Sequence, residues 1–312
     1  MKKFAFVFPG QGSQYVGMLN SFKKINLVKN NIFIANKILK KNIDLIISRK
    51  NNNYIDSTIN TQPALLISEI SIYNFWISYC GLVPKLISGH SLGEYVCLIV
   101  SRIIDLYDVL KIVKVRAFKT QNEFSFRLGG MAVILGLNKH DIKNICYKEK
   151  NINILEISNS NSLKQVVISG YLKSINHVCK ISKYKGAKTT LTMRISGPFH
   201  SSLMLPVMNI LYNNLQKYKL KIPKIKIINN VDVSIYNDLG EIIDSLIRQI
   251  WYPVRWAEIT KFMKFKGITH IIECGPKKII SNLIRRIDPK LNVLSIDNHK
   301  SINLTLNKLL DN

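Results

Sequence analysis

Residues 82–101 read LVPKLISGHSLGEYVCLIVS, and the class of the fold follows from their order. The apolar stretch from Leu82 to Ser88 predicts a strand, and the stretch from Glu94 to Ser101 predicts a helix. The residues between them have the pattern GxSxG. A strand, a tight turn and a helix in succession are typical of an α/β fold, which is the class we predict.

The serine in this turn, Ser91, has the setting of a catalytic nucleophile. A serine at a sharp strand-to-helix turn holds strained backbone angles, and glycines on both sides let the chain close while the hydroxyl projects outward. The backbone N–H of Leu92 would point from the helix N-terminus, where it is placed to stabilise an oxyanion. The alternative is an ordinary glycine-rich turn without catalytic function.

A serine nucleophile needs a base within hydrogen-bond reach, and the chain offers six histidines. They are His90, His140, His177, His200, His270 and His299. His90 precedes the serine, where the tight turn should direct its side chain elsewhere. His200 lies in a Gly-Pro loop that opens a predicted helix, 198–216, where a side chain can project into a cleft. It is the candidate base, unless local hydrogen bonds at the helix start satisfy it.

Two other segments carry candidate binding groups. Gln11 lies in a glycine-containing loop after a predicted strand, 3–8, and would offer a backbone N–H to an oxyanion. This loop lacks the third glycine of a dinucleotide-binding pattern, because Tyr15 stands there. Arg116 lies on or beside the apolar face of a predicted helix. Its planar guanidinium suits the carboxylate of a dicarboxylic acyl group, unless it is an ordinary surface arginine.

The middle of the chain has a pattern of its own. Its segments alternate as strand, helix, strand, strand, helix and strand, which is the ferredoxin-like order. The segments are Met131–Leu137, Asn138–Lys148, Ile152–Ile157, Gln165–Gly170, Tyr171–Lys185 and Lys188–Met193. We therefore expect a large α/β domain of residues 1–125 and 195–312, with a small ferredoxin-like domain of residues 126–194 inserted in it.

Composition narrows the classes of partner. The net charge is +26, but lysines alternate with Ile and Asn along the whole chain instead of forming one arm or stripe, so we expect no nucleic-acid binding. The longest uncharged stretch, Ile70 to Pro84, falls short of the roughly 18 apolar residues that span a bilayer. The five cysteines are scattered, without metal-ligand spacing. We expect a cytoplasmic protein, with neither a bound metal nor a membrane span.

Taken in order, several motifs resemble the malonyl-CoA:acyl carrier protein transacylase family. They are Gln11-Gly12-Ser13-Gln14, Thr61-Gln62-Pro63-Ala64, residues 89–95, Arg116, Gly197-Pro198-Phe199-His200-Ser201 and Glu273-Cys274-Gly275-Pro276. One motif would be weak evidence, but order and spacing match from end to end. The resemblance implies an α/β-hydrolase-like domain with a ferredoxin-like insertion. It also implies transfer of malonyl from malonyl-CoA to holo acyl carrier protein without a cofactor.

The resemblance assigns the chemistry to particular residues. Ser91 would be acylated, and His200 would be its base and then the acid for the leaving thiol. Arg116 would bind the malonyl carboxylate. In this family a backbone carbonyl orients the base in place of an aspartate, and Gln249 stands at that position. The catalytic pair would therefore be a Ser–His dyad.

The resemblance also assigns the pocket. Gln11 and Leu92 would supply the oxyanion N–H groups, and Gln62, Asn159 and Asn161 would line the pocket.

Phe199 resembles the form of its motif that prefers malonyl over branched units. The chain departs from the family pattern at Lys277, where glycine is common, and at Leu163, where proline is frequent, and both positions lie outside the proposed chemistry. We expect a monomer.

Two rival hypotheses remain. An esterase or thioesterase of the α/β-hydrolase type would use a late histidine, His270 or His299, after an acid such as Asp244, and His200 would be dispensable. A basic nucleic-acid-binding module would leave Ser91 and His200 structural and would bind with steep salt dependence.

Overall fold

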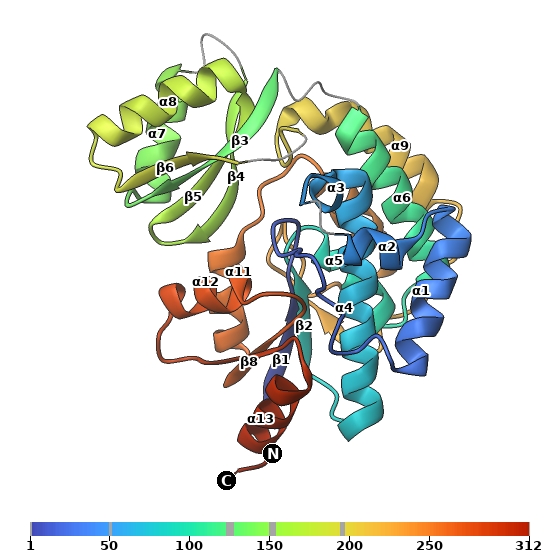
Figure 1. Ribbon diagram of the computed structural model, residues 1–312. Helices are drawn as coiled ribbons and strands as arrows, with labels where there is room; N and C mark the ends of the chain where they lie inside the picture. The colour runs from blue at the N-terminus through green and yellow to red at the C-terminus, as the bar shows by residue number, and fades with distance from the viewer. Residues whose placement is uncertain (1, 50–51, 123–127, 150–153, 194–196, 312) are drawn as a thin grey trace.

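The computed structural model describes residues 2–49, 52–122, 128–149, 154–193 and 197–311. Within them, a parallel sheet in the order β7-β2-β1-β8-β9 forms the centre of the molecule (Figure 1). Its strands are β1 (Phe4–Phe8), β2 (Leu86–Gly89), β7 (Lys226–Ile227), β8 (His270–Cys274) and β9 (Asn292–Ile296). Each neighbouring pair is parallel, as an α/β fold requires.

Strand β1 shows why this sheet needs helices on both faces. All of its side chains are buried, and an unbroken apolar run is typical of a strand covered on both sides. Phe4, Phe6 and Phe8 belong to a core cluster with the first helices of the chain. Ala5 and Val7 point the other way, into a cluster with α11 and α12.

The helices divide accordingly between the two faces of the sheet. The first face is covered mainly by α1 (Asn26–Leu39), α2 (Ile43–Ser48), α4 (Thr58–Cys80), α5 (Gly93–Val100) and α6 (Leu106–Asn122), joined by α10 (Leu239–Arg248) and α13 (His299–Leu310). The other face is covered by α11 (Trp256–Phe265) and α12 (Ile279–Ile287). The short α3 (Asn52–Asp56) precedes α4, and α9 (Leu205–Leu215) packs beside α6.

A second, antiparallel sheet in the order β4-β5-β3-β6 lies at the end of the molecule opposite the two termini (Figure 1). Its elements are β3 (Gly129–Leu135), α7 (Lys139–Glu149), β4 (Leu155–Ser162), β5 (Gln165–Tyr171), α8 (Leu172–Tyr184) and β6 (Thr189–Thr192). They have their own core cluster. The predicted fold class and the ferredoxin-like order are confirmed, while the predicted domain boundaries fall in 123–127 and 194–196, outside the described residues.

Some predicted elements begin later in the structure than expected. The strand predicted from Leu82 begins only at Leu86, because Pro84 has no N–H and the Leu82 carbonyl accepts a hydrogen bond from the Trp76 indole at 2.8 Å.

The helix predicted at 198–216 also begins later. A 3₁₀ turn, Ser202–Met204, precedes α9, and His200 has φ 57°, which no α-helical residue adopts. His200 therefore lies in a loop.

Candidate active site

The turn that presents Ser91 depends on two glycines. A Cβ on Gly89 would lie 1.8 Å from the Gly93 carbonyl carbon, and one on Gly93 would lie 2.2 Å from the Phe8 carbonyl oxygen. Only glycine permits strand β2 and helix α5 to approach this closely. Ser91 itself has φ 53°, so the turn is strained as a nucleophile elbow requires.

Asn230, which the sequence analysis did not single out, holds this turn in place. Its side-chain oxygen accepts a hydrogen bond from the Ser91 N–H at 2.8 Å, and its amide donates to the Gly89 carbonyl at 2.6 Å. The strained backbone of Ser91 is thus tied to a segment far away in sequence. No local pattern around Asn230 signals this role.

Ser91 and His200 meet directly. The Ser91 Oγ lies 2.8 Å from the His200 Nε2. On the far side of the ring, Nδ1 lies 2.7 Å from the Gln249 carbonyl oxygen and 3.2 Å from that of Tyr252. Carbonyl oxygens only accept hydrogen bonds, so we assign the proton of the neutral ring to Nδ1. The lone pair of Nε2 then faces the serine hydroxyl.

His200 is buried, and its surroundings keep it uncharged. Burial lowers the pKa of His200 to about 3, and the positive charge of Arg116 acts in the same direction. At neutral pH the ring is therefore uncharged, and the lone pair of its Nε2 is available to the Ser91 hydroxyl.

Arg116 extends from α6 to the same place. Its Nη2 lies 3.2 Å from the Ser91 Oγ and 3.3 Å from the Gln249 side-chain oxygen, and its guanidinium lies 5.2 Å from the centre of the Tyr95 ring. The residue is only 4% exposed, and its Nε has no hydrogen-bond acceptor among the described residues. Burial lowers the pKa of Arg116, although a guanidinium stays protonated in proteins. A buried cation with spare donors favours an anionic ligand.

Gln249 contributes its side chain as well as its carbonyl. Its Nε2 donates to the Ser91 carbonyl at 2.8 Å and to the Glu94 carboxyl at 2.6 Å. The same carboxyl accepts a hydrogen bond from the Tyr236 hydroxyl at 2.7 Å. Burial raises the pKa of Glu94 to about 7. Neither Glu94 nor Tyr236 was predicted to support the site, because their contact joins residues 142 positions apart in the chain.

Ser91 and His200 line a cavity of about 310 Å³ between the two sheets, whereas Arg116 and Gln249, which contact them, are not among its lining residues. Its lining includes Gly10, Gln11, Gly12, His90, Met131, Val133, Asn159, Asn161, Phe199, Ile280 and Leu283. The cavity thus lies beyond the carboxyl ends of β1 and β2, where open α/β sheets bind ligands. It is lined by both a polar loop and apolar side chains, as small-molecule sites are.

Two backbone N–H groups near Ser91 are free to bind an oxyanion. Neither the Gln11 nor the Leu92 N–H donates to an acceptor within the described part of the chain. The Gln11 side chain instead bonds the Thr58 hydroxyl at 3.0 Å, which holds its loop against α4. Gln11 lines the same cavity as Ser91, and Leu92 directly follows Ser91 in the chain.

The structure also places four other residues named from the sequence, which are Gln62, His90, Lys277 and Leu163. Gln62 is buried in α4 but does not line this cavity. His90 does line it, contrary to the expectation that its side chain turns away, and its Nε2 lies 3.1 Å from the Asn161 side-chain oxygen. Lys277 has φ 62°, a conformation that favours glycine, and its amine donates to the Gly12 carbonyl at 3.3 Å. Leu163 is exposed between β4 and β5.

The late histidines do not reach Ser91. His270 bonds the Thr269 hydroxyl, and His299 bonds the Ser21 carbonyl. Asp244 pairs with Arg248. His200 thus contacts the nucleophile. His270 and His299, which an esterase of the α/β-hydrolase type would use, do not.

The part of the chain that the structure describes shows no group of three His, Cys, Asp or Glu side chains placed to hold a metal ion. In the same residues, no helix combines the length and apolar character needed to cross a membrane.

Comparison with known proteins agrees with this geometry. The acyl transferase domain family matches residues 5–261. A malonyl CoA-acyl carrier protein transacylase of Buchnera aphidicola subsp. Schizaphis graminum is 40% identical over 305 residues, covering 96% of this chain and 97% of its own length. A protein of the same name from Escherichia coli strain K12 is 34% identical, covering 92% and 93%.

Solved structures are similar over their whole length. An acyl-carrier-protein S-malonyltransferase of Burkholderia pseudomallei 1710b superimposes with a TM-score of 0.95 at 39% identity, covering 97% of this chain and 99% of its own. A malonyl-transacylase in complex with a type II PKS acyl-carrier protein superimposes with a TM-score of 0.96 at 32% identity, covering 98% and 100%.

Proposed function

Because the chain belongs to the acyl transferase domain family, we propose that it transfers the malonyl group of malonyl-CoA to the pantetheine thiol of holo acyl carrier protein. The reaction supplies malonyl units to fatty acid synthesis. One observation carries this proposal above all. The hydroxyl of Ser91 lies 2.8 Å from the base His200 and 3.2 Å from the guanidinium of Arg116, so a nucleophile and a carboxylate-binding group meet at one point.

The first half of the reaction forms a malonyl ester on the enzyme. His200 Nε2 takes the proton of Ser91 as its Oγ attacks the thioester carbonyl. The negative charge that develops on the carbonyl oxygen is bound by the N–H groups of Gln11 and Leu92. The C–S bond then breaks, and His200 returns the proton to the departing CoA thiolate. The Gln249 carbonyl stabilises the His200 ring while it is charged.

The second half repeats these steps with the carrier. His200 takes the proton of the pantetheine thiol, and the sulfur attacks the ester carbonyl of malonyl-Ser91. The C–O bond breaks, and the proton passes from His200 to the Ser91 oxygen. The same donors stabilise both tetrahedral intermediates, so one site serves a ping-pong reaction.

Arg116 gives the site its preference for a dicarboxylic acyl group. Its planar guanidinium can form paired hydrogen bonds with the free carboxylate of malonyl. This contact fixes the position of the ester carbonyl and so favours attack by an oriented thiol over attack by water. Phe199 lines the cavity at Ser91, and its ring leaves less room for branched units.

We expect formation of the malonyl-enzyme to be nearly independent of pH between 5.5 and 7.5. His200 acts as a base only when uncharged, and its pKa of about 3 keeps it uncharged throughout this range. A histidine with the usual pKa of about 6.5 would be about nine-tenths protonated at pH 5.5 and would react about tenfold more slowly. Quenched-flow measurement of ester formation distinguishes the two, with circular dichroism at each pH as the control for folding. A tenfold fall at pH 5.5 would contradict the assignment.

Radiolabelled malonyl-CoA tests the function itself. We expect label on the protein within one turnover and its passage to added holo carrier protein, with stoichiometric release of CoA. Apo carrier protein, which lacks the pantetheine thiol, is the matched control and should stay unlabelled. Release of free malonate without labelled carrier would favour the hydrolase instead. Absence of labelled protein, together with salt-dependent binding of DNA or RNA, would favour the nucleic-acid-binding module.

The domain boundaries, the oligomeric state and the location of the protein are also open to test. We propose that residues 126–194 form an inserted domain, that the enzyme is a cytoplasmic monomer, and that it binds no nucleic acid. The separate core of the antiparallel sheet supports the first of these. Light scattering would test the monomer, and titration with DNA at several salt concentrations would test the last.

A further inference from the structure

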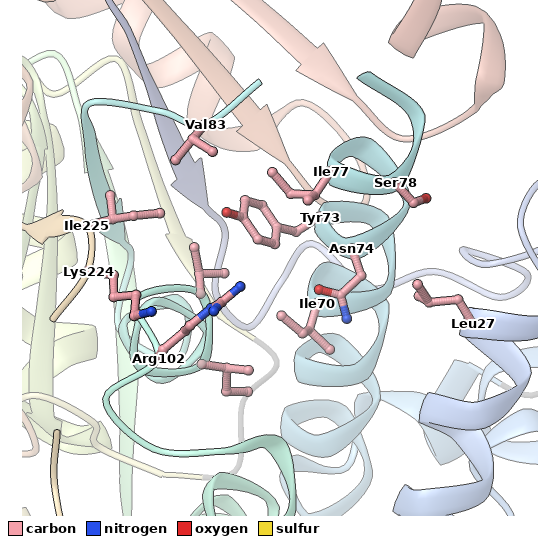
Figure 2. A pocket seen from close by; sticks show the side chains of 12 residues that line it. Leu27, Ile70, Tyr73, Asn74, Ile77, Ser78, Val83, Arg102, Lys224 and Ile225 are labelled. Atoms are coloured by element: carbon pink, nitrogen blue, oxygen red, sulfur yellow. The ribbon is translucent and has the colours of Figure 1, made fainter. Parts of the chain in front are cut away.

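A second cavity, of about 520 Å³, lies between helix α4 and the end of helix α5, and we call it the α4–α5 cavity (Figure 2). It shares no lining residue with the cavity at Ser91. Most of its wall is aliphatic, and consists of Leu27, Ile70, Ile77, Val83, Ile99, Val100 and Ile225. The proposed reaction makes no use of it.

Polar groups without partners face this apolar space. Tyr73 is only 7% exposed, and its hydroxyl, which is not among the fully buried polar atoms, forms no hydrogen bond with the described residues. The guanidinium of Arg102 and the ammonium of Lys224 form no ion pair with any residue that the structure describes. Figure 2 shows Tyr73 and Arg102 extending from opposite sides into the space, with the Lys224 amine pointing toward Arg102. The Asn74 amide adds a fourth group able to donate a hydrogen bond.

The positive charges of Arg102 and Lys224 favour an anionic ligand in the cavity. None of its described lining residues is acidic, and Arg102 and Lys224, both exposed to solvent, bring two positive charges to the cavity without an ion-pair partner among the described residues. The charge of Arg102 lies close enough to act on the pKa of Tyr73, which burial raises. An anionic group in the cavity would pair with both cations and accept a hydrogen bond from the Tyr73 hydroxyl.

We propose that the α4–α5 cavity binds an aliphatic carboxylate of medium chain length, with its carboxylate on Arg102, Lys224 and Tyr73. The planar guanidinium of Arg102 matches a carboxylate, and the aliphatic wall matches a hydrocarbon chain. The cavity's volume is within the usual range for a small-molecule site. This site is separate from the proposed malonyl transfer and does not depend on it.

Calorimetric titration of the intact protein with decanoate, below its micelle concentration, tests the proposal. We expect saturable binding of one decanoate per chain. Decanol, which has the chain without the charge, and acetate, which has the charge without the chain, are the matched probes, and each should bind at least about tenfold more weakly. Decanol binding as tightly as decanoate would overturn the proposal, because the cavity would then be only apolar. Acetate binding as tightly would overturn it too.

Arg102→Gly is the decisive variant. Arg102 has φ 60°, a conformation that glycine adopts without strain, so the variant removes the guanidinium without endangering the fold. We expect its melting temperature to equal or exceed that of the wild type while decanoate binds at least about tenfold more weakly. Tyr73→Phe should weaken binding by a smaller factor.

The control is Lys221→Gln, which removes a nearby exposed charge that does not line the cavity and should bind decanoate normally. Wild-type affinity in Arg102→Gly, or an equal loss in Lys221→Gln, would overturn the proposal. Labelling by malonyl-CoA, measured on the same samples, tests the proposed function separately.

Discussion

Ser91→Ala is expected to abolish the malonyl-enzyme, with transfer to the carrier falling by about 10⁴-fold or more. The alanine retains the position of the backbone but has no oxygen to form the ester. The N–H groups of Gln11 and Leu92 remain, so malonyl-CoA should still bind. Mass spectrometry of the intact protein after mixing with malonyl-CoA measures the ester directly.

A neighbouring serine provides the control for this experiment. Ser88 lies three residues earlier on strand β2, and its hydroxyl donates to the Ile228 carbonyl at 2.9 Å without lining the cavity. Ser88→Ala should lose about 1 kcal/mol of stability and still form the ester. A malonyl adduct on Ser91→Ala of the same mass as on the wild type would show that another residue is the nucleophile.

Arg116→Ala should reduce kcat/KM for malonyl-CoA by about 100-fold or more and affect acetyl-CoA far less. The physical reason is that only malonyl carries the second carboxylate. Without the guanidinium this carboxylate is buried among neutral groups, at a cost of several kcal/mol. The measurement is the transfer rate to holo carrier protein with each thioester as sole donor.

Arg116→Lys separates charge from shape in this prediction. Lysine keeps the positive charge but loses the planar fork, so we expect malonyl transfer to recover only in part. Because Arg116 also contacts the Ser91 Oγ and the Gln249 side chain, a small loss with acetyl-CoA is consistent with the assignment. Equal losses with both thioesters would show that Arg116 only organises the dyad.

The sequence predicted best what a local pattern determines. The GxSxG turn was found because close approach of β2 and α5 demands glycine at particular positions, and the structure shows these contacts at Gly89 and Gly93. The ferredoxin-like order was found because its strands and helices follow one another closely. Strand β9 and helices α1, α2, α3, α10, α12 and α13 were not predicted, since none of them carries a motif comparable to the GxSxG turn.

Contacts between residues far apart in the chain could not be predicted from sequence patterns alone. His200 lies 109 positions from Ser91 in the chain, and its Gly-Pro loop made it the candidate base among six histidines, but only the resemblance to a family assigned it that role. The contacts of Asn230, Glu94 and Tyr236 depend on how distant segments come together, so no motif revealed them. Gln62, assigned by resemblance, lies in the core of α4 away from the cavity at Ser91.

The orientation of His200 has a consequence for how this enzyme tolerates mutation. Both acceptors at its Nδ1 are main-chain oxygens, of Gln249 and Tyr252. In a Ser-His-Asp triad one codon change removes the acceptor, whereas here a substitution at either position leaves an oxygen in place as long as the loop keeps its path. This chain is rich in lysine, isoleucine and asparagine. Substitutions of side chains at positions 249 and 252 would not remove the acceptors that keep the proton of His200 on Nδ1. The function of His200 as a base therefore depends on the path of the backbone from Gln249 to Tyr252 and not on the side chains there.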